Sequence, residues 1–264
     1  MDLGLHDRVA IVTGASRGIG RQVAADLGSE GCHVVLCGRD ETALRDAAAG
    51  VERGNVRAVT VAADMELHDS ADQIVRRALD EFGRIDILVN NAGGNNPRRL
   101  LALSRDDWQQ GFEQNFFSAV RLSLACVPVM KERGWGRIVN VASTFAREPD
   151  PLFGPYSAAK AALVNFSRNL SMAFAADGVL TNCVLPGITI TEGVEANAAV
   201  ASERLGVSTE EVMARMIAKD PIDAGRFGDP SEVSAAVLFL ASEQAAWITG
   251  ATLAVDGGTI RTAP

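Results

Sequence analysis

Tyr156, the only tyrosine in the chain, lies four residues before Lys160 in a segment of helical character, so both side chains point to one side. A free tyrosine has a pKa of about 10 and is a poor base at neutral pH. A neighbouring ammonium lowers that pKa because it stabilises the phenolate. Ser143, just past an apolar run, can hydrogen-bond the same substrate oxygen. The three residues predict proton exchange with a substrate hydroxyl or carbonyl; taken alone, they could equally form an unremarkable surface helix with a capping serine.

A second candidate site is glycine-rich. An apolar run at 9–13 leads directly into glycines at 14, 18 and 20 and then into an amphipathic stretch. Such a turn lets the backbone approach a pyrophosphate, and the following helix supplies N–H donors and a partial positive charge. The residues expected to contact this ligand are Gly14, Ser16, Arg17, Gly18, Ile19 and Gly20.

The same loop also matches the G-x-S-x-G nucleophile turn of a serine hydrolase, centred on Ser16. That class places its histidine late in the chain, after the serine and the acid. The histidines here are at 6, 33 and 68. The dinucleotide interpretation is therefore favoured over the hydrolase.

The elements that must position these residues alternate along the chain. Short runs rich in Val or Ile occur at 9–12, 33–37, 56–62, 85–89, 136–141 and 180–185, as expected for strands buried on both faces. Helix-length segments lie between them, for example at 17–29 and 68–82. This alternation predicts an α/β fold: a single doubly wound domain over 1–264, with about seven parallel strands and helices on both faces.

Residues 188–228 do not follow this alternation of strands and helices. Thr189, Thr191 and Gly193 lead into a helical stretch at 194–219, between the sixth strand and a last helix at 230–242. An insertion after the carboxyl end of a strand lies where ligands bind in open sheets. We predict a small helical substrate lid; the alternative is a surface helical hairpin with no role.

Composition and net charge limit the classes of molecule that the protein is expected to bind. The chain has 264 residues and a net charge of −8, which argues against a dedicated nucleic-acid binder. No apolar run approaches the roughly 18 residues of a membrane-spanning helix, and we expect a cytoplasmic protein with a small-molecule substrate and no membrane partner. The cysteines at 32, 37, 126 and 183 lack metal-site spacing, and strand alternation would put Cys32 and Cys37 on opposite faces. No metal is expected.

Together these motifs resemble the short-chain dehydrogenase/reductase family. The resemblance spans positions 13 to 258 and rests on the glycine loop and on Asn90, Asn91, Ala92, Gly93, Asp64, Asn115, Ser143, Tyr156, Lys160, Pro186, Gly187 and the closing segments 248–250 and 255–258. It implies a Rossmann-type fold that binds NAD or NADP. It also implies hydride transfer between that cofactor and a ketone or secondary alcohol, with Tyr156 as general acid/base assisted by Lys160, Ser143 and Asn115.

The resemblance implies individual roles as well. Asp64 would contact the adenine amino group, Lys160 would hold the nicotinamide ribose, and Asn115 would position a water that links Lys160 to solvent. The other cofactor contacts it implies are Tyr156, Met65, Asn91, Ala92, Gly93, Pro186, Gly187, Ile188 and Thr189. Thr13 and Asn90 are expected to hold the fold together instead.

The end of the second strand decides between the two nucleotides. An acid there binds both ribose hydroxyls and repels a 2′-phosphate. That position is Gly38, followed by Arg39, and Arg17 lies in the glycine loop. Two guanidiniums can form bidentate bonds with one phosphate, which predicts NADP(H). Asp40 supports the NAD(H) alternative if the register shifts by two; otherwise it is the N-cap of a helix at 41–49.

The residues that would contact the substrate are less clearly indicated than those that would contact the cofactor. Candidate wall residues are Asn95, Asn96, Phe145, Arg147, Phe153 and the lid. Arg98, Arg99 and Arg147 would either meet an anionic substrate or remain solvated loop charges.

Many members of the family are 3-oxoacyl-carrier-protein reductases. These usually have Ala-Arg-Glu where this chain has Ser171, Met172 and Ala173, which leaves smaller thioesters and free ketones open. The family forms dimers or tetramers, and Leu170, Met172 and Phe174 fit a homo-oligomeric contact or core packing. A non-catalytic dinucleotide-binding protein is a further alternative, but it would have no need of Ser143, Tyr156 and Lys160.

Overall fold

The computed structural model describes residues 2–52, 56–219 and 221–262. Its strands are β1 (Val9–Thr13), β2 (His33–Gly38), β3 (Ala58–Ala62), β4 (Ile87–Asn90), β5 (Gly136–Val141), β6 (Val179–Pro186) and β7 (Thr252–Val255). They form one sheet in the order β3-β2-β1-β4-β5-β6-β7, and every neighbouring pair is parallel. The predicted doubly wound parallel sheet is confirmed.

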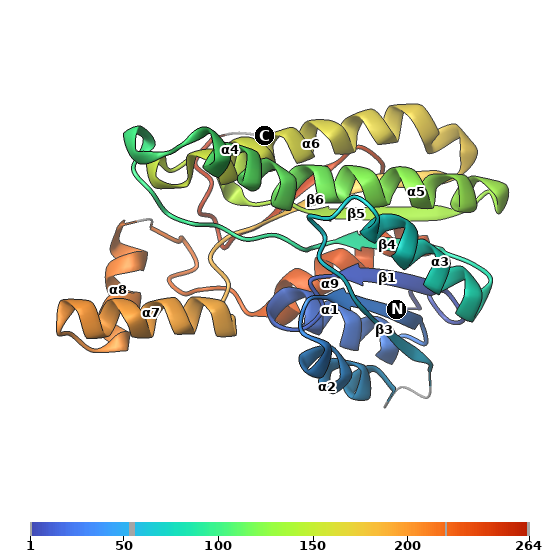
Figure 1. Ribbon diagram of the computed structural model, residues 1–264, viewed down its shortest axis with the longest axis horizontal. Coiled ribbons are helices and arrows are strands. Elements are labelled where there is room, and N and C mark those ends of the chain that lie inside the picture. The colour runs from blue at the N-terminus through green and yellow to red at the C-terminus, as the bar shows by residue number, and fades with distance from the viewer. Residues whose placement is uncertain (1, 53–55, 220, 263–264) are drawn as a thin grey trace.

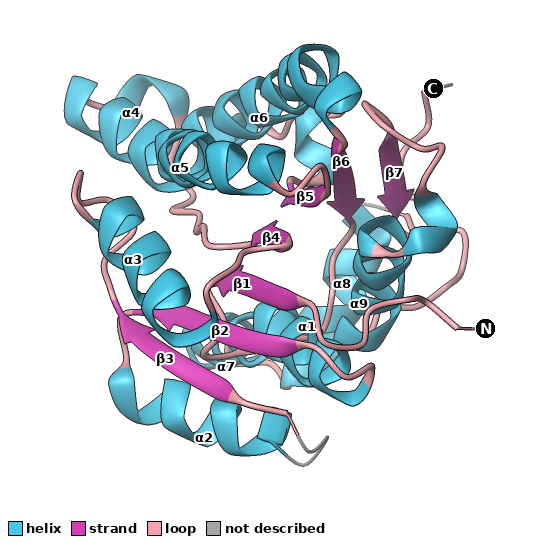
Figure 2. Cartoon of the chain, turned by 90° about the vertical axis from the view of Figure 1, so that its right-hand side faces the viewer, coloured by secondary structure: helices cyan, strands magenta, loops and turns pink. Residues whose placement is uncertain are grey.

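Helices cover both faces of this sheet. They are α1 (Gly18–Ser29), α2 (Glu41–Val51), α3 (Ser70–Phe82), α4 (Arg105–Phe112), α5 (Ser118–Glu132), α6 (Gly154–Phe174), α7 (Glu192–Leu205), α8 (Thr209–Lys219) and α9 (Pro230–Ala241). Figure 2 shows α3, α5 and α6 on one side of the strands and α1, α2 and α9 on the other. Because all strands are parallel, their carboxyl ends meet along one edge.

The observed element ends differ from the predicted ones by one or two residues in most cases. The third strand begins at Ala58 instead of 56, the fourth at Ile87 instead of 85, and the sixth runs from Val179 to Pro186. The second helix-length segment begins at Ser70 instead of 68. Strand ends depend on where a neighbouring strand offers hydrogen-bond partners, which apolar composition does not reveal.

Two buried apolar layers flank the sheet. One contains Cys32 and the other contains Cys37, so the two thiols lie on opposite faces as predicted. All four cysteines are buried and unpaired. Burial raises the pKa of the Cys126 thiol to about 12, which keeps it neutral and unreactive.

The helical stretch expected at 194–219 consists of two helices, α7 and α8. Helix α7 ends at Gly206, whose φ of 66° is the left-handed conformation that glycine adopts at a helix end, and α8 follows. In Figure 1 this hairpin stands clear of the helices that cover the two faces of the sheet. Among the described residues, no helix has the length and apolar character needed to cross a bilayer.

Candidate functional site

The glycine loop joins β1 to α1 at the carboxyl edge of the sheet. Gly14 and Gly18 have φ of 64° and 55°, which side chains rarely adopt. A Cβ on Gly20 would overlap the carbonyl oxygen of Gly14 and Nδ2 of Asn91. Arg17 precedes α1 with extended backbone, and its side chain does not cap the helix. The N-cap residue therefore leaves the N–H groups at the start of α1 without a side-chain partner of its own.

One of these N–H groups donates a hydrogen bond to a residue of α7. Glu192, the first residue of α7, accepts a hydrogen bond from Gly18 N at 2.9 Å through Oε2. The methyl group of Thr191 lies 3.0 Å from the position that a Gly18 Cβ would take. An anion that binds this helix end must therefore displace the Glu192 carboxylate. Sequence reasoning missed Glu192, since nothing local indicates a contact with a residue 174 positions earlier.

The end of β2 has the character expected for a phosphate site. Gly38 is the last residue of the strand, and Ser16 Oγ lies 3.7 Å from the position that its Cβ would take. Arg17 and Arg39 are both exposed beside it. Asp40 accepts a hydrogen bond from Ala43 N at 3.0 Å and is the N-cap of α2. The N-cap interpretation of Asp40 is confirmed.

Next along the edge, the end of β3 carries two expected cofactor contacts. Asp64 is partly buried, and its Oδ1 accepts a hydrogen bond from Glu66 N at 3.1 Å. Met65 is buried in the apolar layer below. These two residues lie next to β2 in the sheet order, on the side where Arg39 emerges.

The segment after β4 is tied to the glycine loop. Thr13 Oγ1 accepts hydrogen bonds from the backbone N–H groups of Asn91 and Ala92 at 3.0 and 2.9 Å. Asn91 Nδ2 donates to Thr13 O at 3.0 Å. Asn90 Nδ2 donates to Asn140 Oδ1 at 2.8 Å, inside the core. Thr13 and Asn90 thus hold neighbouring strand ends together, as the sequence predicted.

Ser143, Tyr156 and Lys160 meet at the carboxyl end of β5. Lys160 is buried, and its Nζ donates to Val141 O at 2.8 Å. The ammonium lies 5.7 Å from the centroid of the Tyr156 ring. The edge of Phe145 packs against that ring at 6.3 Å between centroids. Ser143 and Tyr156, 13 positions apart, are brought together because α6 packs against the turn Thr144–Ala146 that follows β5.

The electrostatics of this cluster differ from the expectation. Burial raises the pKa of Tyr156, and a hydrogen bond from the Ser143 hydroxyl, which favours the phenolate, opposes that rise. The expected net lowering of the Tyr156 pKa is therefore wrong for this structure, because burial outweighs the contacts that stabilise the phenolate. Burial lowers the pKa of Lys160 to about 8, so this lysine keeps its positive charge only below that pH.

Asn115 lies in a π-helical turn, Glu113–Phe117, between α4 and α5. Its Nδ2 donates to the carbonyl oxygens of Gly94 and Gly111 at 2.9 and 3.0 Å. A Cβ on Gly93 would lie 2.7 Å from Asn115 Oδ1 and 3.4 Å from Lys160 Nζ. Such turns occur frequently at functional sites. A side chain at 93 would therefore crowd Asn115, and glycine avoids this overlap.

The segment after β6 is the last of the segments at the carboxyl edge of the sheet. Pro186 ends the strand, and Gly187 N donates to Val255 O at 3.0 Å. Ile188 is partly buried, and the buried Thr189 donates through Oγ1 to Gly187 O at 3.2 Å. This places both residues between the end of β6 and the lid. Every predicted cofactor or catalytic residue thus lies in the loops at this edge or in the helices that follow them.

The wall on the substrate side is built by the loop before α6. The rings of Phe145 and Phe153 stack at 5.1 Å between centroids. Lys219 at the end of α8 donates to Asp150 at 2.7 Å, which connects α8 to this loop. Asn95 and Asn96 are exposed on the opposite loop. Among the described residues, no group of three or more His, Cys, Asp or Glu side chains is arranged to hold a metal ion.

Comparison with known proteins agrees with this geometry. A family model for short chain dehydrogenases matches residues 8–200. The short-chain reductase protein NovJ of Streptomyces niveus is 36% identical over 253 residues, which is 96% of this chain and 94% of NovJ. A 3-oxoacyl-[acyl-carrier-protein] reductase of Vibrio cholerae is 35% identical over 97% of this chain and 98% of its own length. The crystal structure of L-sorbose reductase from Gluconobacter frateurii, complexed with NADPH and L-sorbose, superposes with a TM-score of 0.96 at 34% identity and full coverage of both chains. This chain belongs to the short-chain dehydrogenase family.

Proposed function

We propose that this protein is an NADP(H)-dependent oxidoreductase that interconverts a ketone and a secondary alcohol. The observation that carries the proposal is the meeting of Ser143, Tyr156 and Lys160 beside Gly93, at the edge that also carries the glycine loop. The NADPH complex of L-sorbose reductase, with its TM-score of 0.96, supports the choice of cofactor.

The residues present fit a dinucleotide. The loop around Gly14, Gly18 and Gly20 has no room for side chains, and the start of α1 offers N–H donors to a pyrophosphate. Arg17 and Arg39 flank Gly38 where a 2′-phosphate would lie, and Asp40, the acid that the NAD(H) alternative requires, is committed to α2. Bound NADPH would supply the hydride for carbonyl reduction.

The protein's own groups handle the proton. In reduction, Tyr156 donates its phenolic proton to the carbonyl oxygen, and the Ser143 hydroxyl hydrogen-bonds that oxygen. The Lys160 ammonium, protonated below a pKa of about 8, stabilises the phenolate that remains. Oxidation of an alcohol runs these steps in reverse.

A direct test is a titration with NADPH and with NADH, followed by nicotinamide fluorescence, and then by NADPH oxidation with a series of ketones. Tighter binding of NADPH together with carbonyl-dependent oxidation would support the proposal. Binding of neither dinucleotide would contradict it. Tighter binding of NADH would contradict the assignment of Arg17 and Arg39.

Replacing Arg39 by aspartate is expected to weaken NADPH binding about 10- to 100-fold and to leave NADH binding within about threefold. The change removes a charge-assisted phosphate contact and adds repulsion. Dissociation constants from the same fluorescence titration give the result. Arg76→Asp is the matched control, since it makes the same charge change on α3. Equal loss of affinity for both dinucleotides would contradict the role of Arg39.

Replacing Glu192 by glutamine is expected to tighten NADPH binding about three- to tenfold. The wild-type carboxylate occupies the Gly18 N–H and repels the pyrophosphate, whereas a neutral amide competes less for the helix end. Glu195→Gln removes the same charge one turn further along α7 and serves as the control. If both variants bind NADPH equally, the Gly18 contact has no influence on cofactor affinity.

We also propose that α7 and α8 serve as a lid over the substrate.

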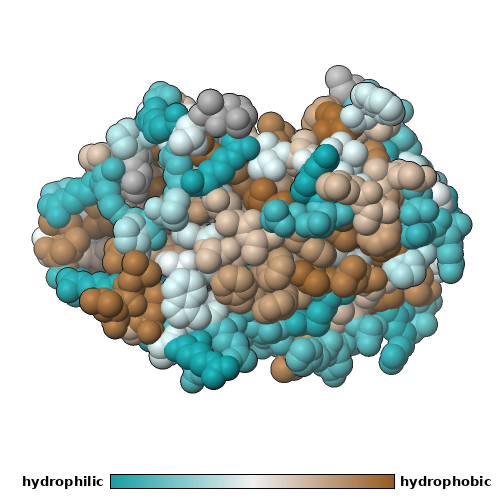
Figure 3. Space-filling model, turned by 90° about the horizontal axis from the view of Figure 1, so that it is seen from above, coloured by the Kyte–Doolittle hydropathy of each residue, from teal (hydrophilic) through white to brown (hydrophobic). Residues whose placement is uncertain are grey.

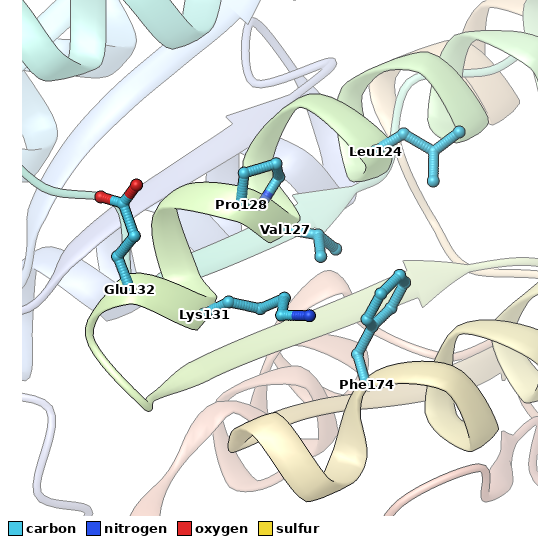
Figure 4. Close-up of a pocket in the computed structure, with 6 residues that line it drawn as sticks. All are labelled: Leu124, Val127, Pro128, Lys131, Glu132 and Phe174. Carbon is cyan, nitrogen blue, oxygen red and sulfur yellow. The ribbon is translucent and has the colours of Figure 1, made fainter.

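We further propose a homo-oligomeric assembly, either a dimer or a tetramer. Figure 3 views the face that carries α4, α5 and α6 and shows apolar side chains gathered across it. Met172 on this face is 71% exposed and suits a subunit contact, whereas Leu170 is buried in the core and does not. Between α5 and α6 lies a groove, shown in Figure 4, lined by Leu124, Val127, Pro128, Lys131, Glu132 and Phe174. A monomer mass by light scattering would contradict the assembly.

A further inference from the structure

The arginines of this protein differ in whether their guanidinium groups have hydrogen-bond or ion-pair partners. Five of those in the described part of the chain are buried or partly buried, namely Arg8, Arg84, Arg121, Arg137 and Arg147. The first four donate to carboxylates or backbone carbonyls, for example Arg84 to Asp86 at 2.7 Å. The side chain of Arg147 has no hydrogen-bond or ion-pair partner among the described residues. Its guanidinium nitrogens are not among the buried side-chain atoms without a partner, so the charge remains accessible to a ligand.

Arg147 lies beside the proposed catalytic residues. It directly follows the 3₁₀ turn Thr144–Ala146, and its backbone N–H donates to Thr144 O at 2.9 Å. At about 2.0 Å of rise per residue, this turn places Arg147 within about 8 Å of Ser143 along the chain. The charges of Lys160 and Arg147 both act to lower the pKa of the buried Cys183 thiol. Both charges thus lie close enough to this thiol to act on it.

The carboxylates closest in sequence are already engaged. Glu148 accepts hydrogen bonds from the backbone N–H groups of Arg261 and Thr262 at 2.6 and 2.9 Å. Asp150 accepts from Lys219 at 2.7 Å and from Leu152 N at 2.8 Å. The loop that follows Ser143 thus carries a positive charge while the carboxylates of Glu148 and Asp150 are committed elsewhere.

We propose that Arg147 binds an anionic group of the substrate, so that the preferred substrates are small oxo acids or oxo phosphates and the corresponding hydroxy compounds. A carboxylate or phosphate would satisfy the planar guanidinium through paired hydrogen bonds. Phe145 and Phe153 would contact the carbon chain between this group and the carbonyl. The inference rests on the proposed reductase function and adds the substrate's charge to it.

The test compares matched carbonyls in NADPH oxidation by the whole enzyme. Pyruvate, acetoacetate and 4-oxopentanoate, in which zero, one and two carbons separate the two groups, are each measured against their methyl esters. Dihydroxyacetone phosphate is measured against dihydroxyacetone to separate phosphate from carboxylate recognition. At least one anion is expected to have a kcat/KM about 10- to 100-fold above that of its neutral partner.

Arg147→Met is expected to abolish this preference by lowering kcat/KM for the anion about 10- to 100-fold, with the neutral partner within about twofold. Arg147→Lys keeps the charge but loses the planar fork, and should retain part of the preference. Arg133→Met, an exposed arginine at the opposite end of β5, is the matched control and should retain all of it.

The possible outcomes distinguish the role of Arg147 from the reductase function itself. Reduction of neutral carbonyls with no preference for any anion would overturn the role of Arg147 and leave the reductase function standing. Equal losses for anion and neutral partner in Arg147→Met would also overturn it, since they would indicate a structural role. No NADPH oxidation with any carbonyl would contradict the reductase function, and the inference with it.

Discussion

Replacing Tyr156 by phenylalanine is expected to lower kcat about a thousandfold while NADPH still binds within about threefold of the wild-type affinity. The variant lacks only the hydroxyl that exchanges the proton, and general acid–base catalysis contributes about 10²- to 10⁴-fold to enzyme rates. The ring that packs against Phe145 is kept, so the wall of the site should not collapse. Steady-state NADPH oxidation gives kcat, and the fluorescence titration gives the affinity.

The matched control for this change is Ser157→Ala. Ser157 is the next residue on α6, it is buried, and its hydroxyl has no partner among the described residues. Removing it should leave kcat within about twofold of wild type, since no hydrogen bond is lost. Near-normal turnover in Tyr156→Phe would rule out Tyr156 as the acid/base, whereas a large loss in both variants would point to disruption of α6.

Replacing Gly20 by alanine is expected to weaken NADPH binding at least about a hundredfold and to destabilise the fold by about 1–3 kcal/mol. The added Cβ would overlap the backbone oxygen of Gly14 and the amide of Asn91, and neither can move without opening the loop. Asn91 is held by its hydrogen bonds to Thr13. A displaced loop would no longer present its N–H groups to the pyrophosphate.

Gly50→Ala provides the comparison for this second result. Gly50 lies in α2, and a Cβ there would meet nothing within 4 Å. Alanine has the higher helix propensity, so this variant should be as stable as wild type or slightly more so, with unchanged NADPH affinity. Urea unfolding and the fluorescence titration measure both quantities. Unchanged affinity in Gly20→Ala would mean that the loop tolerates side chains and does not form the cofactor cradle.

The strands show why much of the fold was predictable. Runs such as 9–12 consist of residues that suit strands buried on both faces, and their alternation with helical segments leaves few possible topologies. The lid shows the limit of this reasoning. Its composition indicated a helix at 194–219, but the left-handed turn at Gly206 divides it, and a single glycine in a helical pattern does not reveal such a turn in advance.

The candidate site was predictable where the chemistry is local. Tyr156 and Lys160 share a helix face by their spacing, and the glycines of the first loop are required by backbone geometry. Asp40 was ambiguous between ribose acid and N-cap, and it was decided by the point at which β2 ends. The pKa of Tyr156 was not predictable, because it depends on burial by residues from distant segments.

The sequence by itself therefore determined the order of elements, the family and the residues able to bind a dinucleotide and move a proton, since local spacing and residue type govern these. Only the tertiary structure placed Glu192 on Gly18 and left Arg147 as the partly buried guanidinium without a partner among the described residues. The physical reason is that ion pairs and desolvation depend on distances in space. Loops distant in sequence converge at the carboxyl edge of a parallel sheet, and which charges meet there is decided by packing.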